Sequence, residues 1–198
     1  MDISQLKWLN ESRVTIKDDG DTFTVYAPPK SDFFNNPIPE NEVFSKPQGN
    51  APFLYTEVKG DFVVRVRVTP SFVANYDAAC IMIIHNENLW LKAAFEKSDF
   101  GTTAVVSVVT NIVSDDANGC NINADSVWLQ VARVGDNFAV HYSLDGKKFD
   151  MVRLCLLPVG ATVKVGVEAQ CPIGDGCEQT FNGFTIENRT VKNLRAGI

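Results

Sequence analysis

The sequence predicts an all-β protein built as an antiparallel sandwich or barrel. Short runs rich in Val, Ile, Phe and Thr are separated by Gly, Asp, Asn and Pro, which is typical of consecutive strands joined by turns. Helical periodicity is weak along the whole chain. The 198 residues, 45% of them hydrophobic, suffice to bury the core of a single domain of this class, and we expect one domain over residues 1–198.

The strands follow one another from the N-terminus. Val14–Lys17 and Thr22–Ala27 flank a DDGD turn and form the first hairpin. A second turn at Val58–Asp61 precedes a long strand that places apolar side chains on one face and two arginines on the solvent face: Phe62, Val64, Val66 and Val68 against Arg65 and Arg67. The later strand-like runs are AACIMIIHN, LWLKAAFE, AVVSVVTNIV, VWLQVARVGDNFAVHYSLDGKKFDMVRLCL, TVKVGVEAQ and QTFNGFTIEN.

The run HYSLDGKKFDMV resembles a catalytic constellation but predicts a hairpin. Asp145-Gly146 between two alternating strands is a strong turn signal, because glycine accepts the positive φ that such turns require. His141 and Ser143 share a strand face, but two residues along a strand they lie roughly 6.5 Å apart. That separation is too large for a nucleophile and its base, so no triad is expected.

The segment 30–52 differs from the rest because proline is too dense there for a central strand. We expect an irregular loop, which in compact domains is often functional. Its phenylalanines are candidate anchors for a protein partner, and the alternative is that they plug one end of the sandwich: Phe33, Phe34 and Phe44.

Charge and composition exclude several classes of partner. The net charge of −6 and the lack of a basic patch argue against nucleic acid. The N-terminal stretch lacks the pattern of a signal peptide, and the apolar runs are too short to cross a membrane. We therefore expect a cytoplasmic protein whose five cysteines are free thiols. The C-x₅-C spacing of Cys171 and Cys177, without a nearby His, does not fit a zinc site, and a redox-sensitive pair stays open.

Several stretches together resemble the DUF1349 family over nearly the whole chain, from Trp8 to about Ile186. They occur in order as SDFFNNP, FLYTEVKGDFVVRVRV, YDAACIMI, LWLKAAFE, VVSVVTNIVSDD, VWLQVARVGDNFAVHYSLDGKKFDMVR and VGVEAQCP. The resemblance implies a concanavalin A-like jelly-roll β-sandwich of two antiparallel sheets. It also implies a cytosolic regulator connected with enolase and glycolysis. Because this fold carries lectins, glycosidases and binding modules, the fold alone does not choose among functions.

A candidate ligand groove follows from side-chain alternation in LWLKAAFE. Trp90, Lys92 and Glu96 project from one face of that strand, where a sugar ring could stack on the indole and bond the charged groups. Lys92 and Glu96 lie roughly 13 Å apart along the strand, so each needs another partner. Neighbouring strands add four further candidates to this concave groove: Asp77, Ser107, Asn111 and Glu168.

Three functions stay open on this basis. The first is a non-catalytic regulator that contacts enolase or another metabolic enzyme, and the second is a module that binds a carbohydrate or sugar phosphate. The third and weakest is a glycoside hydrolase with Asp77 and Glu96 as its acid pair, because no E-x-D-x-x-E triplet aligns three acids on one strand. Acidic residues in SDDANG and CPIGDG usually only shape turns, so no metal and no cofactor is assigned.

Overall fold

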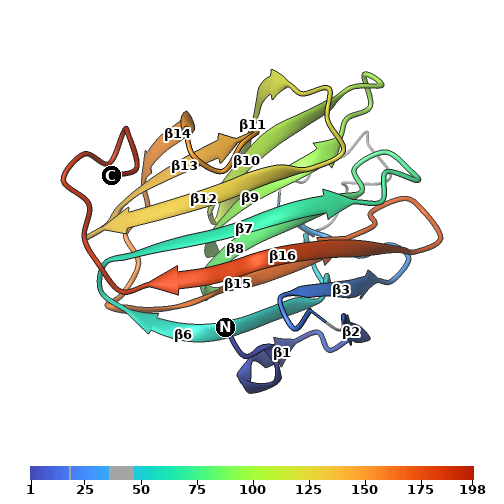
Figure 1. The fold of residues 1–198 in the computed structure, drawn as a ribbon, viewed down its shortest axis with the longest axis horizontal. Coiled ribbons are helices and arrows are strands. Elements are labelled where there is room, and N and C mark those ends of the chain that lie inside the picture. Colours follow the sequence, from blue (N-terminus) through green and yellow to red (C-terminus); the bar gives the residue numbers. More distant parts are fainter. Residues whose placement is uncertain (18, 36–46) are drawn as a thin grey trace.

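The computed structural model describes residues 1–17, 19–35 and 47–198. Within these ranges the chain forms two seven-stranded sheets that pack face to face, with antiparallel pairing throughout (Figure 1). The predicted jelly-roll sandwich of two antiparallel sheets is therefore confirmed. Among the described residues, none of the helical segments has the length and apolar character that a membrane-spanning helix needs.

Sheet A contains the strands that carry the candidate groove. In spatial order they are β1 (Lys7–Leu9), β6 (Phe53–Lys59), β15 (Thr162–Gln170), β8 (Ala78–Asn86), β9 (Leu89–Lys97), β10 (Thr103–Asn111) and β11 (Val113–Asn121). Sheet B contains β14 (Asp150–Leu156), β13 (Asn137–Ser143), β12 (Val127–Val134), β7 (Phe62–Pro70), β16 (Cys177–Glu187), β3 (Thr22–Ala27) and β2 (Val14–Ile16). A short 3₁₀ turn, η1 (Ile3–Gln5), precedes β1, and β4 (Phe33–Phe34) pairs with β5 (Gln48–Gly49).

The main core lies between the two sheets. On β7 the predicted alternation is confirmed, because Phe62, Val64, Val66 and Val68 are buried in this core whereas Arg67 is exposed. Phe23 of β3 stacks on Phe181 of β16, with ring centroids 5.3 Å apart. A β-branched and aromatic interior of this kind fixes strand register, because a slip of one residue would turn the apolar side chains outward.

The hairpin between β13 and β14 is architectural, as the Asp-Gly signal predicts. Gly146 has φ 73°, and the Asp145 carboxylate accepts the backbone N–H groups of Lys147 and Lys148. These two hydrogen bonds lower the pKa of Asp145 to about 2. His141 is buried, and its ring lies 3.1 Å from the Arg195 carbonyl, so it holds the C-terminal segment against sheet B.

Candidate functional site

Strand β9 presents the predicted row of side chains on the face of sheet A that is turned away from sheet B. Leu91, Ala93 and Phe95 point into the main core. Trp90 and Lys92 point the opposite way, and Trp90 belongs to a second apolar cluster. We call this second face the outer face of sheet A.

A segment of the chain covers this outer face. Residues 31–35, here called the strap, are bonded to sheet A at both ends. At one end Ser31 and Cys171 form a β-bridge. At the other end the Asn35 N–H donates to Ser114 Oγ, and Ser114 N–H donates to the Asn35 carbonyl, both at 2.8 Å. The segment 30–52, for which an irregular loop is expected from the sequence, therefore includes two short paired strands, β4 in the strap and β5 outside it.

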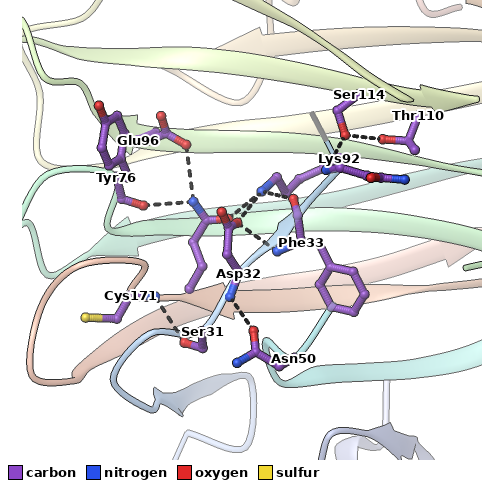
Figure 2. Close-up of polar contacts among 12 residues, drawn as sticks. Ser31, Asp32, Phe33, Asn50, Tyr76, Lys92, Glu96, Thr110, Ser114 and Cys171 are labelled. Atoms are coloured by element: carbon purple, nitrogen blue, oxygen red, sulfur yellow. Dashed lines mark hydrogen bonds and ion pairs between the residues drawn. The ribbon is translucent and has the colours of Figure 1, made fainter. Parts of the chain in front are cut away.

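Lys92 fixes the middle of the strap (Figure 2). Its Nζ donates to Asp32 Oδ1 at 3.0 Å and to the Phe33 carbonyl at 2.9 Å. The third bond is to Gln170 Oε1 at 2.6 Å, and Lys92 is only 2% exposed. An ammonium group has three N–H donors, so all of them are used inside the protein.

Gln170 connects Lys92 to Glu96, the other charged member of the β9 row. Gln170 Nε2 donates to Glu96 Oε2 at 3.3 Å and to the Tyr76 carbonyl at 2.8 Å. Lys92 and Glu96 are too far apart along β9 to pair directly, and the Gln170 amide bonds to both of them. We refer to Asp32, Lys92, Glu96, Glu168 and Gln170 as the Lys92 cluster.

Burial shifts the protonation of the acids in this cluster. It raises the pKa of Glu96 to about 8 and that of Glu168 to about 7, although the Lys92 charge works against both shifts. Glu168 is fully buried, its oxygens make no hydrogen bond of ordinary geometry among the described residues, and the neighbouring Cys80 thiol opposes the rise in its pKa only in part. A carboxyl group in such surroundings favours its neutral form.

The opposite balance holds at Lys92. Burial on its own would lower the pKa of Lys92, but the carboxylates of Asp32 and Glu168 outweigh it and hold that pKa above its usual range. Lys92 therefore stays charged, and its pairing with Asp32 is a buried ion pair. Removing either partner of such a pair leaves an uncompensated charge in the interior.

The aromatic member of the row is covered as well. Trp90 is 2% exposed, and Phe33 of the strap packs edge-on against it with ring centroids 6.0 Å apart. Phe33 is itself buried, whereas Phe34 is half-buried. Phe33 thus covers Trp90 on the outer face of sheet A, whereas the alternative interpretation of the loop placed the phenylalanines at one end of the sandwich. Phe44 lies outside the described residues.

Three of the predicted groove residues lie elsewhere. Ser107 pairs with Ala93 and shares its face, so its side chain points toward sheet B, whereas Asn111 is exposed at the end of β10. Asp77 lies beside Cys171 and Cys177, which belong to the main core. The carboxylate that pairs with Lys92 is Asp32 rather than Asp77.

The acid pair of the hydrolase hypothesis is not formed. Ala78, which is paired with Glu96, lies on the outer face, whereas Asp77 beside it is directed toward the main core. The two carboxyl groups therefore lie on different sides of sheet A and do not flank a common substrate bond.

The SDDANG run is a strand rather than the turn that its acidic residues indicate in the sequence. Its residues belong to β11, the edge strand of sheet A, where Asp115 pairs with Arg153 at 3.1 Å. Charged residues on an edge strand discourage pairing with another chain, which accounts for the acidic character of this run.

A pocket of about 490 Å³ opens at one end of the outer face. Trp90 forms part of its wall, and the turn between β8 and β9 contributes Asn86 and Asn88. Lys164 of β15 and Asn35 of the strap also line it. The pocket combines amide groups with one ammonium group and one carboxylate, that of Glu87, and the largely covered Trp90 adds little exposed surface to it.

An apolar turn lies next to this pocket. Ile112 and Val113, here called the apolar tip, join β10 to β11 and are 66% and 51% exposed. The Ile112 N–H donates to the Asn88 carbonyl at 2.7 Å, and the Asn35 side-chain amide donates to the Ile112 carbonyl. Ile112 has φ 70°, a left-handed conformation that is strained for a β-branched side chain.

Sequence reasoning missed two members of the Lys92 cluster. Gln170 shares its strand face with Glu168, so the alternation of TVKVGVEAQ was a usable signal for it. Asp32 lies in the SDFFNNP motif, which offered a weaker signal because the path of that segment depends on the fold.

Comparison with known proteins gives a family match over most of the chain. Residues 8–189 match the family described as "Protein of unknown function (DUF1349)". The chain is 31% identical over 186 residues to "Regulation of enolase protein 1" of Saccharomyces cerevisiae, covering 93% of this chain and 90% of that protein.

Two solved structures place the fold among known sandwiches. A functionally unknown protein from Saccharomyces cerevisiae superposes with a TM-score of 0.84 at 29% identity, over 94% of this chain and 98% of that chain. The carbohydrate-binding module CBM66 from Bacillus subtilis gives a TM-score of 0.53 at 12% identity, over 91% of this chain and 95% of that chain. At this low identity the second likeness concerns the fold alone.

Proposed function

We propose, from the premise that this chain belongs to the DUF1349 family, that it is a non-catalytic cytoplasmic protein that regulates a metabolic enzyme by direct contact. Enolase is the first candidate partner, because a relative 31% identical is named for its regulation. The observation that carries the proposal is the covered outer face of sheet A. There the strap and a fully bonded Lys92 occupy the place where a substrate groove would lie.

The apolar tip is the contact that we propose for this partner. Ile112 exposes two thirds of its surface while holding a conformation that favours Asn or Gly. A strained and exposed apolar residue beside a pocket contributes little to folding, whereas such residues are enriched at sites of function. Burial of Ile112 and Val113 against a partner would remove apolar surface from water.

The experiment is a binding titration of purified enolase, combined with enolase turnover measured with and without this protein. Ile112→Asn should weaken binding roughly tenfold, because it removes an apolar contact but accepts the left-handed backbone. The matched control is Leu156→Asn on β14, since Leu156 is also 66% exposed but lies on sheet B. Equal binding by both variants would exclude the tip as the contact, and no binding or effect by the wild type would exclude enolase.

A second candidate function is binding of a carbohydrate or sugar phosphate, and the composition of the pocket favours it. Asn88 and Lys164 offer an amide and a cation within one pocket of about 490 Å³, whose lining also includes Glu87 and the largely covered Trp90. Calorimetry with neutral sugars and their phosphates tests this function. Lys164→Met should weaken the binding of sugar phosphates but not that of neutral sugars. Lys148→Met serves as the control, because this side chain is 82% exposed on the hairpin of sheet B. Absence of heat with every ligand would reject this function.

A further inference from the structure

Three side chains suited to metal binding converge where β15 passes into β16, at one end of the sandwich (Figure 1). They are Asp77, which precedes β8, Cys171, which follows β15, and Cys177, which begins β16. One carboxylate oxygen and the two sulfur atoms all lie within 4.8 Å of one another. All three residues are buried, with exposures of 0%, 1% and 7%.

Asp77 presents an unpartnered oxygen to this cluster. Its Oδ2 accepts the Ala74 N–H at 2.7 Å, which fixes the orientation of the carboxyl group. Its Oδ1 is buried and makes no hydrogen bond of ordinary geometry in the part of the chain that the structure describes, where the thiols of Cys171 and Cys177 are its neighbours. Buried carboxylate oxygens are normally bonded, so this oxygen, whose neighbours are two weakly donating thiols, is available to bind a cation.

The two cysteines are held in place by the strap and by sheet B. The Cys171 N–H donates to the Ser31 carbonyl at 3.1 Å, and the Cys171 sulfur points away from the Lys92 cluster (Figure 2). Cys177 Sγ accepts the Gln179 side-chain amide at 3.0 Å. Burial raises the pKa of both thiols, and the nearby Asp77 charge raises the pKa of Cys177 further.

The loop between the two cysteines closes over the cluster. A Cβ at Gly174 would lie 2.7 Å from Cys171 Sγ and 3.8 Å from Asp77 Oδ1. Only glycine lets the backbone approach the sulfur this closely, so the CPIGDG run acts as a cover for the cluster.

We propose that Asp77, Cys171 and Cys177 bind a thiophilic divalent cation, with Zn²⁺ as the first candidate. Thiolates prefer such metals, and two thiolates with one carboxylate neutralise a dication with one negative charge in excess. Around one Zn²⁺ the ligand atoms lie about 3.5–3.8 Å apart, so atoms already within 4.8 Å need only a small movement. On binding, the two thiols release their protons to solvent, and water or a carbonyl oxygen completes the four ligands.

A disulfide between the two cysteines explains the arrangement less well. It would leave Asp77 Oδ1 still without a partner, and a neighbouring carboxylate disfavours the thiolate that must attack. Sequence spacing gave no sign of the metal site, because the third ligand comes from a distant part of the chain. The site is independent of the proposed contact with enolase.

The test uses the whole protein, freed of metal by a chelator under reducing conditions and titrated with Zn²⁺ against a colorimetric indicator. We expect the wild type to bind one Zn²⁺ per chain. Asp77→Asn and Cys171→Ser should each lower the affinity for Zn²⁺ by a factor of roughly 100 or more. Asp77→Asn is the sharper variant, because an asparagine Oδ1 still accepts the Ala74 N–H. Cys120→Ser and Cys155→Ser change thiols outside the cluster and should leave binding unaltered.

Two measurements keep the test independent of how the variants fold. Co²⁺ added to the wild type should produce a thiolate-to-metal charge-transfer band, and Zn²⁺ should slow alkylation of Cys171 and Cys177 but not of the exposed Cys120. Zn²⁺ bound no more tightly by the wild type than by Cys171→Ser would overturn the proposal. A Co²⁺ complex without the band, or a Cys171–Cys177 disulfide without metal affinity, would also overturn it.

Discussion

Two buried polar clusters at sheet A differ in the partners that they give to a carboxylate. In the Lys92 cluster the Asp32 carboxylate faces an ammonium group 3.0 Å away, and every ammonium donor is bonded. In the cluster of Asp77, Cys171 and Cys177 a carboxylate oxygen faces two thiols and has no hydrogen-bond partner among the described residues. The Asp32 charge is compensated inside the protein, which fits a structural role, whereas we propose that the Asp77 carboxylate binds a cation.

The largest expected effect is the loss of compensation at Lys92. Lys92→Met keeps the apolar stem but leaves the Asp32 carboxylate buried without its cation. The free energy of unfolding, measured by urea denaturation, should fall by about 3–5 kcal/mol. The exposed pair of Lys148 and Asp150 is the control, and Lys148→Met should change that free energy by less than about 0.5 kcal/mol.

A double variant separates lost compensation from lost packing. Lys92→Met combined with Asp32→Leu removes both charges, so most of the lost stability should return. If the double variant is as unstable as Lys92→Met, the loss of stability does not come from an uncompensated Asp32 charge. The ion pair with Lys92 would then not be what stabilises this carboxylate.

The next effect concerns the pH dependence of the same cluster. The folded protein holds the pKa of Glu168 at about 7 from an ordinary value of 4.5, so between these values the folded state binds more protons than the unfolded chain. Stability contributed by the protonated Glu168 is therefore present at low pH and is lost as pH rises to 7. Urea denaturation should show this loss, about 2–3 kcal/mol, in the wild type.

Glu168→Gln supplies the matched comparison, because it keeps the shape and removes the titration. The wild type should lose more stability than the variant between pH 5 and pH 8. Glu96, whose pKa is about 8, titrates in both proteins, and because the Glu168 charge is a smaller cause of this raised pKa than burial is, the contribution of Glu96 to the difference should be small. Parallel stability curves would exclude Glu168 as a source of the pH dependence.

The fold and one row of the site follow from alternation, which is a local property of a strand. Phe62 and Val64 face the core while Trp90 and Lys92 share the outer face, because successive side chains point to opposite sides. Alternation does not tell which faces of neighbouring strands coincide. That is why Ser107 was assigned to the wrong face of sheet A.

The partners of the predicted row depend on long-range topology. Asp32 is 60 residues from Lys92 and Gln170 is 78 residues away, and both contacts require knowledge of which segments are neighbours. The same holds for Asp77 and its thiols, which meet only because β15 lies beside β8. The composition of a run therefore indicated which residues are unusual but not what they contact.

The smallest expected change in the free energy of unfolding is at Asp77, and it tests directly how this carboxylate differs from Asp32. In metal-free protein Asp77→Asn should change the free energy of unfolding by less than about 1 kcal/mol, because Oδ1 has no hydrogen bond to lose among the described residues and the bond from Ala74 is kept. Added Zn²⁺ should then raise the melting temperature of the wild type but not that of the variant, since a ligand stabilises only the folded state that binds it. A loss as large as that of Lys92→Met in metal-free protein would mean that Asp77 is already compensated, and the contrast between the two clusters would fail.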